Sequence, residues 1–148
     1  MEIENAPDRL RGLPSWLLNQ GALAANRIVG EGLAAVGAHR SHFAVLSALD
    51  EFGAASQAAL GRRCGIDRSD MVALVNALSR DGLVAKRPDP ADRRRNVITL
   101  TTAGRRRLRS LDTVVARLQG ALVAPLSAAE RRQLVVLLRR VVEHHGAT

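Results

Sequence analysis

Hydrophobic residues recur at helical spacing in the segment between Asp67 and Gly82. Met71, Leu74, Val75 and Leu78 follow the spacing i, i+3, i+4, i+7, which places them on the core-facing side of a helix. Asp67 is a suitable N-cap residue, and Gly82 is a suitable stop. The pattern predicts a helix here whose opposite face is small and polar at its start and basic at its end.

Apolar spacing together with caps and glycine stops predicts five further helices, and two short apolar runs predict strands. The other helices are expected over residues 15–36, over 41–52 with Ser41 as cap and Val45, Leu46, Leu49 and Phe52 on one side, over 56–66, from Thr101 onward, and from a capping box at Ser127 and Glu130 onward. The strands are expected over 83–88 and 96–100, joined by the loop between them.

The order of these elements predicts a mainly α fold with a small β-hairpin. Two short helices joined by a glycine-containing turn are typical of a helix-turn-helix, and the hairpin that follows makes it a winged helix. We expect one chain, 1–148, with a winged helix-turn-helix over 41–104 and a helical dimerisation region over 10–38 and 105–146.

The terminal helices carry more apolar surface than a winged helix of this size needs. Leu108, Leu111, Val115, Leu118 and Leu122 repeat by steps of three and four, a narrow seam that two helices bury between them. These helices need a partner, and the apolar helix expected over 15–36 is the natural third component. If the terminal helices also hold two copies of the chain together, the expected dimer contacts are Leu17, Leu118, Leu122, Leu134, Leu138 and Val141.

Charge adds a second expected partner. The net charge is +8, from twenty-two Lys and Arg against fourteen Asp and Glu, which favours a polyanion: nucleic acid first, an anionic membrane surface second. The loop "RPDPADRRR" concentrates this charge. Arg93, Arg94 and Arg95 repel one another in isolation but replace counterions beside a duplex. Asp89 and Pro90 are expected to set the turn, and Asp92 to hold one arginine.

The exposed face of the 67–82 helix offers side chains that can read bases. Asn76 can pair bidentately with adenine, and Val72 or Ala73 can contact a thymine methyl. Asp70 either supports the helix start or accepts from cytosine, and a solvated helix face is the alternative for each residue. The expected DNA contacts are Ser56, Gln57, Arg68, Ser69, Asp70, Val72, Ala73, Asn76, Arg80, Arg87, Arg93, Arg94 and Arg95.

Residues 56–108 resemble the core of MarR-type winged-helix transcriptional regulators. The resemblance rests on Gly82-Leu83-Val84 after the second short helix, on Asp92-Arg93-Arg94 in the wing, and on Leu100-Thr101 through Gly104. It implies a homodimer on an imperfect palindrome of double-stranded DNA, with Arg94 as the wing arginine and Asp92 as its partner. It also implies a regulator, usually a repressor, that a small aromatic or anionic effector releases from DNA. The expected pocket residues are Trp16, His39, His42 and Phe43.

Other functions remain open at this stage. A winged helix that binds nucleic acid without sequence preference, or that binds proteins, has the same pattern. An enzyme would depend on Cys64 with His39 or His42 as base, although a buried structural thiol is the expected role of Cys64. The sequence shows no metal-ligand cluster, cofactor motif, secretory signal or membrane-length apolar run, so we expect a cytoplasmic protein without catalytic activity, cofactor or membrane partner.

Overall fold

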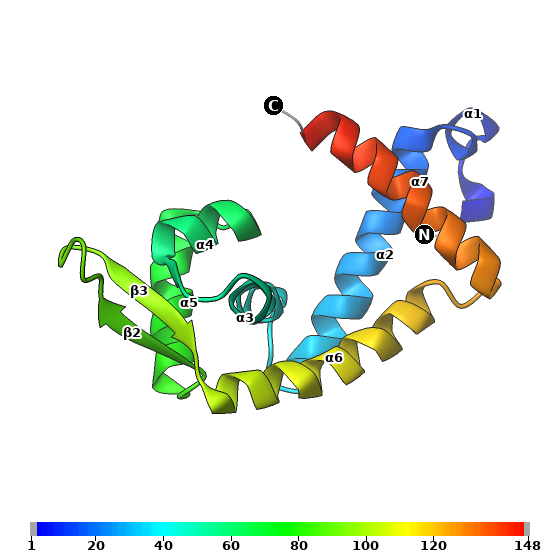
Figure 1. Cartoon of the computed structure of the whole chain (residues 1–148). Coiled ribbons are helices and arrows are strands. Elements are labelled where there is room, and N and C mark those ends of the chain that lie inside the picture. The colour runs from blue at the N-terminus through cyan, green and yellow to red at the C-terminus, as the bar shows by residue number, and fades with distance from the viewer. Residues whose placement is uncertain (1–2, 147–148) are drawn as a thin grey trace.

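A computed structural model describes residues 3–146, which form a mainly helical fold with one small sheet at one end (Figure 1). The predicted fold class is confirmed, with two short additions at the amino end. In chain order the elements are η1 (Ile3–Asn5), α1 (Asp8–Arg11), α2 (Pro14–Ala34), α3 (Arg40–Phe52), β1 (Ala55–Ser56), α4 (Gln57–Cys64), α5 (Arg68–Arg80), β2 (Val84–Pro88), β3 (Asn96–Leu100), α6 (Thr102–Leu122) and α7 (Ala128–Gly146).

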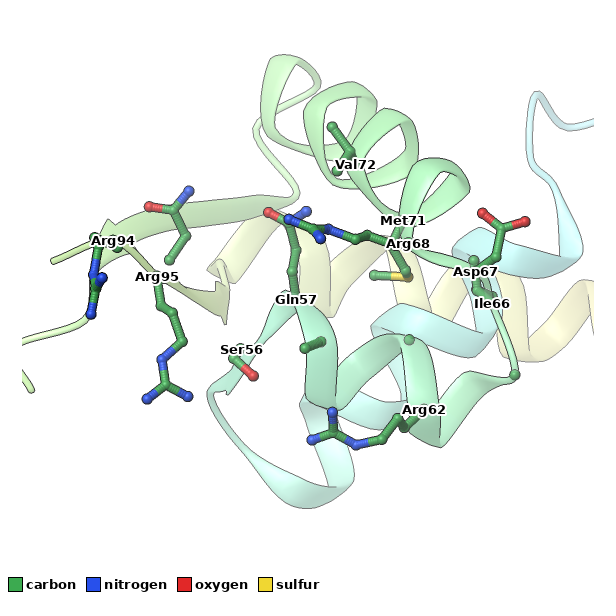
Figure 2. Close-up of a pocket in the computed structure, with 14 residues that line it drawn as sticks. Ser56, Gln57, Arg62, Ile66, Asp67, Arg68, Met71, Val72, Arg94 and Arg95 are labelled. Atoms are coloured by element: carbon green, nitrogen blue, oxygen red, sulfur yellow. The ribbon is translucent and has the colours of Figure 1, made fainter. Parts of the chain in front are cut away.

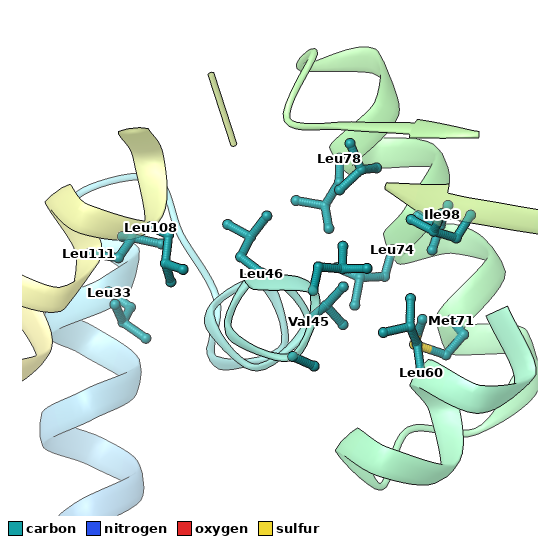
Figure 3. Packing of buried hydrophobic residues seen from close by; sticks show 14 of the residues in the cluster. Leu33, Val45, Leu46, Leu60, Met71, Leu74, Leu78, Ile98, Leu108 and Leu111 are labelled. Carbon is teal, nitrogen blue, oxygen red and sulfur yellow. The ribbon is translucent and has the colours of Figure 1, made fainter. Parts of the chain in front are cut away.

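The core is built around α3, which lies between two groups of elements (Figure 3). Val45 and Leu46 of α3 are fully buried. On one side they face Leu33 of α2 and the α6 leucines, and on the other they face α4, α5 and Ile98 of β3. One continuous apolar core therefore joins the winged helix to the helices that precede and follow it.

The sheet has three antiparallel strands in the order β1-β3-β2. The predicted hairpin is present, with Val84 opposite Leu100 and Lys86 opposite Ile98. The prediction of only two strands is wrong, because Ala55 of β1 pairs with Ile98. A strand of two residues is too short to produce an alternating pattern that a sequence could show.

The predicted start of α3 is also corrected. Its cap is His39 rather than Ser41: the ring nitrogen Nδ1 of His39 accepts a hydrogen bond from the backbone N–H of Ser41 at 3.3 Å. Ser41 is already the second helical residue. The caps expected at Ser127 and Glu130 are confirmed, since each side chain accepts the other residue's backbone N–H.

Phe52, which the sequence assigns to the core side of α3, is 56% exposed. It lies in the last turn of α3, where its ring packs beneath the guanidinium of Arg63, 4.1 Å from the ring centroid. Arg63 on α4 thus takes the place of an apolar partner.

Three leucines of the seam along α6 pack within the chain. Leu108, Leu111 and Leu118 are buried, and α6 packs on α2. At Gly32 of α2 an added Cβ would come within 2.3 Å of the Leu118 side chain, so the two helices touch closely there. The assignment of Leu118 to the dimer interface is therefore wrong: a narrow seam does not reveal whether the helix that covers it belongs to the same chain.

Apolar side chains of α2 and α7 remain exposed near the end of α6 that lies farthest from the wing. No residue of α7 is buried, and Leu138 and Val141 are 36% and 46% exposed. Leu17 and Leu18 of α2 are each 43% exposed. Within residues 3–146, no helix combines the length and the apolar character that crossing a bilayer requires.

Candidate nucleic-acid interface

The turn between α4 and α5 fixes the start of the second helix. Gly65 adopts a left-handed conformation (φ 66°) that ends α4 and redirects the chain. The Asp67 carboxylate then accepts the backbone N–H of Asp70 and the hydroxyl of Ser69, each at 2.9 Å. The backbone N–H of Asp70 is the main cause that lowers the pKa of Asp67. The predicted capping role of Asp67 is confirmed.

The two faces of α5 separate as the sequence predicts. Met71, Leu74, Val75 and Leu78 are buried, while Ser69, Val72, Ala73, Asn76 and Arg80 are exposed. Asp70 is also exposed and lies beside Asp67. The Asp67 carboxylate accepts a hydrogen bond from the Asp70 side chain and repels its negative charge, and both effects raise the pKa of Asp70. A helix with this surface can enter a major groove without displacing core residues.

A groove of about 790 Å³ lies between α4, α5 and the wing. Arg68 and Val72 of α5 line one side, Ser56 and Gln57 line the middle, and Arg94 and Arg95 of the loop after β2 line the other (Figure 2). The structure therefore brings side chains from three separate stretches of sequence to one surface. The sequence did not single out Arg62, which lines the same groove from the last turn of α4.

The wing loop is held by its two aspartates. Asp89 accepts the backbone N–H of Ala91 at 2.9 Å, which closes the turn. Asp92 accepts the backbone N–H of Arg94 at 3.1 Å and its Nε at 3.2 Å, and lies 3.5 Å from Nε of Arg95. The sequence predicts one arginine on Asp92, whereas the structure places two there. The backbone N–H of Arg94 is the largest cause that lowers the pKa of Asp92, followed by the Arg94 side chain.

The contact between the wing and α5 is polar at the surface. The ammonium Nζ of Lys86, on β2, donates a hydrogen bond to Oδ1 of Asn76, on α5, at 2.6 Å. Arg80 and Arg87 are exposed on the same two elements. Lys86 is a second residue that sequence reasoning missed, because nothing in a linear pattern indicates that positions 76 and 86 meet.

The expected pocket residues do not gather in one place within the protomer. Trp16 lies in the first turn of α2, whereas His39 follows its end, so that most of a 21-residue helix, about 30 Å long, separates them. His42 is half-buried, and burial is the main cause that lowers its pKa, with His39 adding to the effect. Phe43 packs against the core. A separate cavity of about 560 Å³ between α3 and α5 includes His39 but neither His42 nor Phe43.

Cys64 is partly buried at the end of α4 and packs against the core. Its thiol donates to the carbonyl of Ala44 at 3.6 Å, and burial raises its pKa in spite of nearby Arg63. A raised pKa keeps the thiol protonated and weakens it as a nucleophile. No group of His, Cys, Asp and Glu within residues 3–146 is arranged to hold a metal ion.

Comparison with known proteins identifies this arrangement. The model of the MarR family matches residues 36–95, from the end of α2 to the arginines of the wing. The PcaV transcriptional regulator from Streptomyces coelicolor, solved with its natural ligand, is 32% identical, with 93% of this chain and 97% of PcaV covered and a TM-score of 0.74. The chain belongs to the MarR family.

Two further proteins similar to this chain are transcriptional repressors. CouR, a transcriptional repressor solved on a 23-mer DNA duplex, is 28% identical, with 91% of this chain and 96% of CouR covered and a TM-score of 0.82. The repressor NicR of Pseudomonas putida is 31% identical over 101 residues, 68% of this chain. The match covers 64% of the length of NicR and 56% of the length of another curated relative.

Proposed function

We propose that this MarR-family chain is a dimeric regulator of transcription that binds double-stranded DNA at a pseudo-palindromic operator. The observation that carries the proposal is the shared groove, which unites the exposed face of α5 with Arg94 and Arg95 of the wing. A recognition helix and a basic loop on one surface can contact a major groove and the minor groove beside it. The CouR repressor, solved on DNA, has the same fold.

The arginines supply affinity and the helix supplies sequence preference. Arg93, Arg94 and Arg95 displace counterions from phosphates, which gives binding that weakens steeply with salt. Side chains on the exposed face of α5 contact base edges, which gives discrimination. In this proposal residues 41–104 bind DNA, while the helices within 10–38 and 105–146 hold two copies together.

A second copy is the proposed cover for the exposed apolar surface. Leu17, Leu134, Leu138 and Val141 lie on α2 and α7, none of them buried in the protomer. Leu122, which is half-buried at the end of α6, is the proposed contact from that helix. Two-fold pairing through these helices presents two α5 helices to one face of the duplex.

We further propose repression relieved by a small aromatic or anionic effector, in a regulator that acts in the cytoplasm. PcaV, which shares the fold, was solved with a natural ligand. The proposed contacts to the effector remain Trp16, His39, His42 and Phe43. Within one protomer, Trp16 is too distant to contact the same effector as the other three. Catalysis has no support in the contacts of Cys64, whose hydrogen bond goes to a backbone carbonyl and not to a histidine.

A salt titration on two duplexes tests the proposal. Binding sites are first selected from a randomised pool, and affinity is then measured on the selected duplex and on a shuffled duplex of the same composition. We expect the selected duplex to bind at least about 10³-fold more tightly and both affinities to fall steeply with salt. Equal affinity for the two duplexes would instead identify a winged helix that binds DNA without sequence preference.

A further inference from the structure

Lys86 is the only lysine in the chain, and it lies on β2 rather than in the arginine-rich loop. It pairs across the sheet with Ile98, which is fully buried, and Val84, two positions earlier, is 2% exposed. Cross-strand partners and alternate strand positions share a face of a sheet. Lys86 therefore leaves the sheet on the face that packs against α5, and this brings its ammonium group to Asn76.

The hydrogen bond between these residues fixes how the Asn76 amide is oriented. An ammonium group has three donors and no acceptor, so the atom of Asn76 that faces Nζ is the acceptor Oδ1. Nζ lies 2.6 Å from Oδ1, and the charge of the ammonium strengthens the bond. The amide nitrogen Nδ2 of Asn76 has no hydrogen-bond partner among residues 3–146 and remains able to donate.

This orientation changes which base the pair can contact. A free asparagine pairs bidentately with adenine by accepting from N6 and donating to N7. Here one of the two lone pairs of Oδ1 accepts from Lys86, and the positive ammonium beside it repels the N6 donor of adenine, while its two remaining N–H groups can donate to a base acceptor. Guanine presents two neighbouring acceptors, N7 and O6, to the major groove, whereas adenine presents one acceptor and one donor.

We infer that Asn76 and Lys86 act as one donor-only unit that selects guanine over adenine at one position of each half-site. The inference rests on the proposed function and replaces the adenine contact expected from Asn76 alone. Both side chains are exposed, and Asn76 lies on the α5 face that also carries Ala73 and Arg80. Lys86 is then a specificity-determining residue supplied by the wing rather than by the recognition helix.

The test measures base preference at the position that Asn76 contacts. That position is located first, as the one at which Asn76→Ala loses discrimination on the selected site. Affinities for duplexes that carry each of the four bases there are then measured for the wild type and for Lys86→Met. We expect the wild type to prefer guanine over adenine by about tenfold or more, and Lys86→Met to abolish or reverse that preference, because Oδ1 is freed to accept from adenine.

Arg87→Met is the matched control. It removes one positive charge from the adjacent position of β2, whose side chain points to the opposite face of the sheet. We expect it to weaken binding to all four duplexes equally. In the Asn76→Ala background, Lys86→Met should leave the guanine-to-adenine ratio unchanged. Because the altered side chains are all exposed, the melting temperatures should match that of the wild type.

Four results would overturn the inference. A wild type that prefers adenine, an Asn76→Ala variant that relaxes no position, and a Lys86→Met variant that weakens all four duplexes equally each contradict the donor-only unit while leaving the proposed function intact. Failure of the wild type to enrich any sequence contradicts the proposed function and removes the basis of the inference with it.

Discussion

Asp92 organises the wing at the level of single residues. Its carboxylate accepts the backbone N–H and the Nε of Arg94 and pairs with Arg95, while the Arg94 side chain stays 92% exposed. The guanidinium of Arg94 is thus oriented without being removed from solvent. Arg93 forms no ion pair with any other residue in 3–146, so the loop combines two fixed cations with one that can adapt to a phosphate.

This arrangement predicts how Asp92 titrates. Because the folded state lowers the pKa of Asp92, the contribution of its carboxylate to the wing is complete above the ordinary Asp pKa of about 3.9 and is lost as the pH falls through the lower folded value. Carbon NMR of the carboxyl group should show a midpoint below about 3.9. In Arg94→Ala the midpoint should rise only part of the way, since the backbone N–H remains.

A midpoint for Asp92 at or above the ordinary value would contradict this account of the wing. Glu130 provides an internal reference, because the backbone N–H of Ser127 lowers its pKa in the capping box of α7, far from any arginine of the wing. Its midpoint should be unchanged in Arg94→Ala.

The sequence predicts residue roles where the interaction is local. Asp67 and Asp92 bond to groups within three residues of themselves, and both roles follow from position and side-chain type. Arg62 and Lys86 were missed because their importance depends on which distant elements lie beside them. The effector contact of His39 stays a prediction, and its observed hydrogen bonds, to the backbone N–H and the hydroxyl of Ser41, are those of a helix cap.

At the scale of elements, the start of α6 is held against the turn that precedes β2. Thr101 caps α6 through its Oγ1 and donates the same hydroxyl to the carbonyl of Gly82 at 2.6 Å. At Gly104 an added Cβ would lie 2.0 Å from the backbone oxygen of Leu83. A backbone atom cannot move aside as a side-chain end can, so only glycine fits.

Gly104→Ala is therefore expected to destabilise the fold by about 2–3 kcal/mol, measured by denaturant unfolding. Gly120→Ala, on the same helix, is the matched control, because nothing lies within 4 Å of its added Cβ. It should be neutral or stabilising by up to about 1 kcal/mol. Similar losses in both variants would contradict the close contact between α6 and Leu83.

Most helices were predictable because they carry several turns of apolar spacing, and the short α4 was predictable from its cap Ser56 and its stop Gly65. The strand β1 was not, since two residues carry no period. Within the seam of α6, Leu118 is predicted as a dimer contact but is buried against α2 of the same chain. Leu118 shows the physical reason: an apolar stripe demands burial, but the choice between α2 of the same chain and a second copy depends on tertiary packing, here on the close approach at Gly32.

At the scale of the whole molecule, the exposed apolar surface of α2 and α7 predicts a dimer. Leu138→Asp places a charge on this surface and should yield monomers at micromolar concentration, measured by sedimentation, because a buried unpaired carboxylate is costly. Phe52→Ser is the control, since Phe52 is an exposed hydrophobic residue on α3, outside the proposed interface, and this variant should remain dimeric. A monomeric wild type would contradict the prediction.

The central claim is that two copies present their recognition helices and wings in fixed register with the DNA helix. Successive major grooves on one face lie about 34–36 Å apart. Inserting five base pairs between the half-sites of the selected operator turns one half-site to the opposite face of the duplex. The same insertion outside the operator leaves the register unchanged and serves as the control.

The affinity of the wild-type protein for these duplexes tests that claim most directly. We predict that the central insertion lowers affinity by roughly thirtyfold or more, while the flanking insertion has no effect. In free energy, that loss is half of the difference between specific and nonspecific binding, which is about 10³-fold in affinity. Equal affinity for the centrally interrupted and the intact operator would contradict a rigid two-fold arrangement of the DNA-binding surfaces.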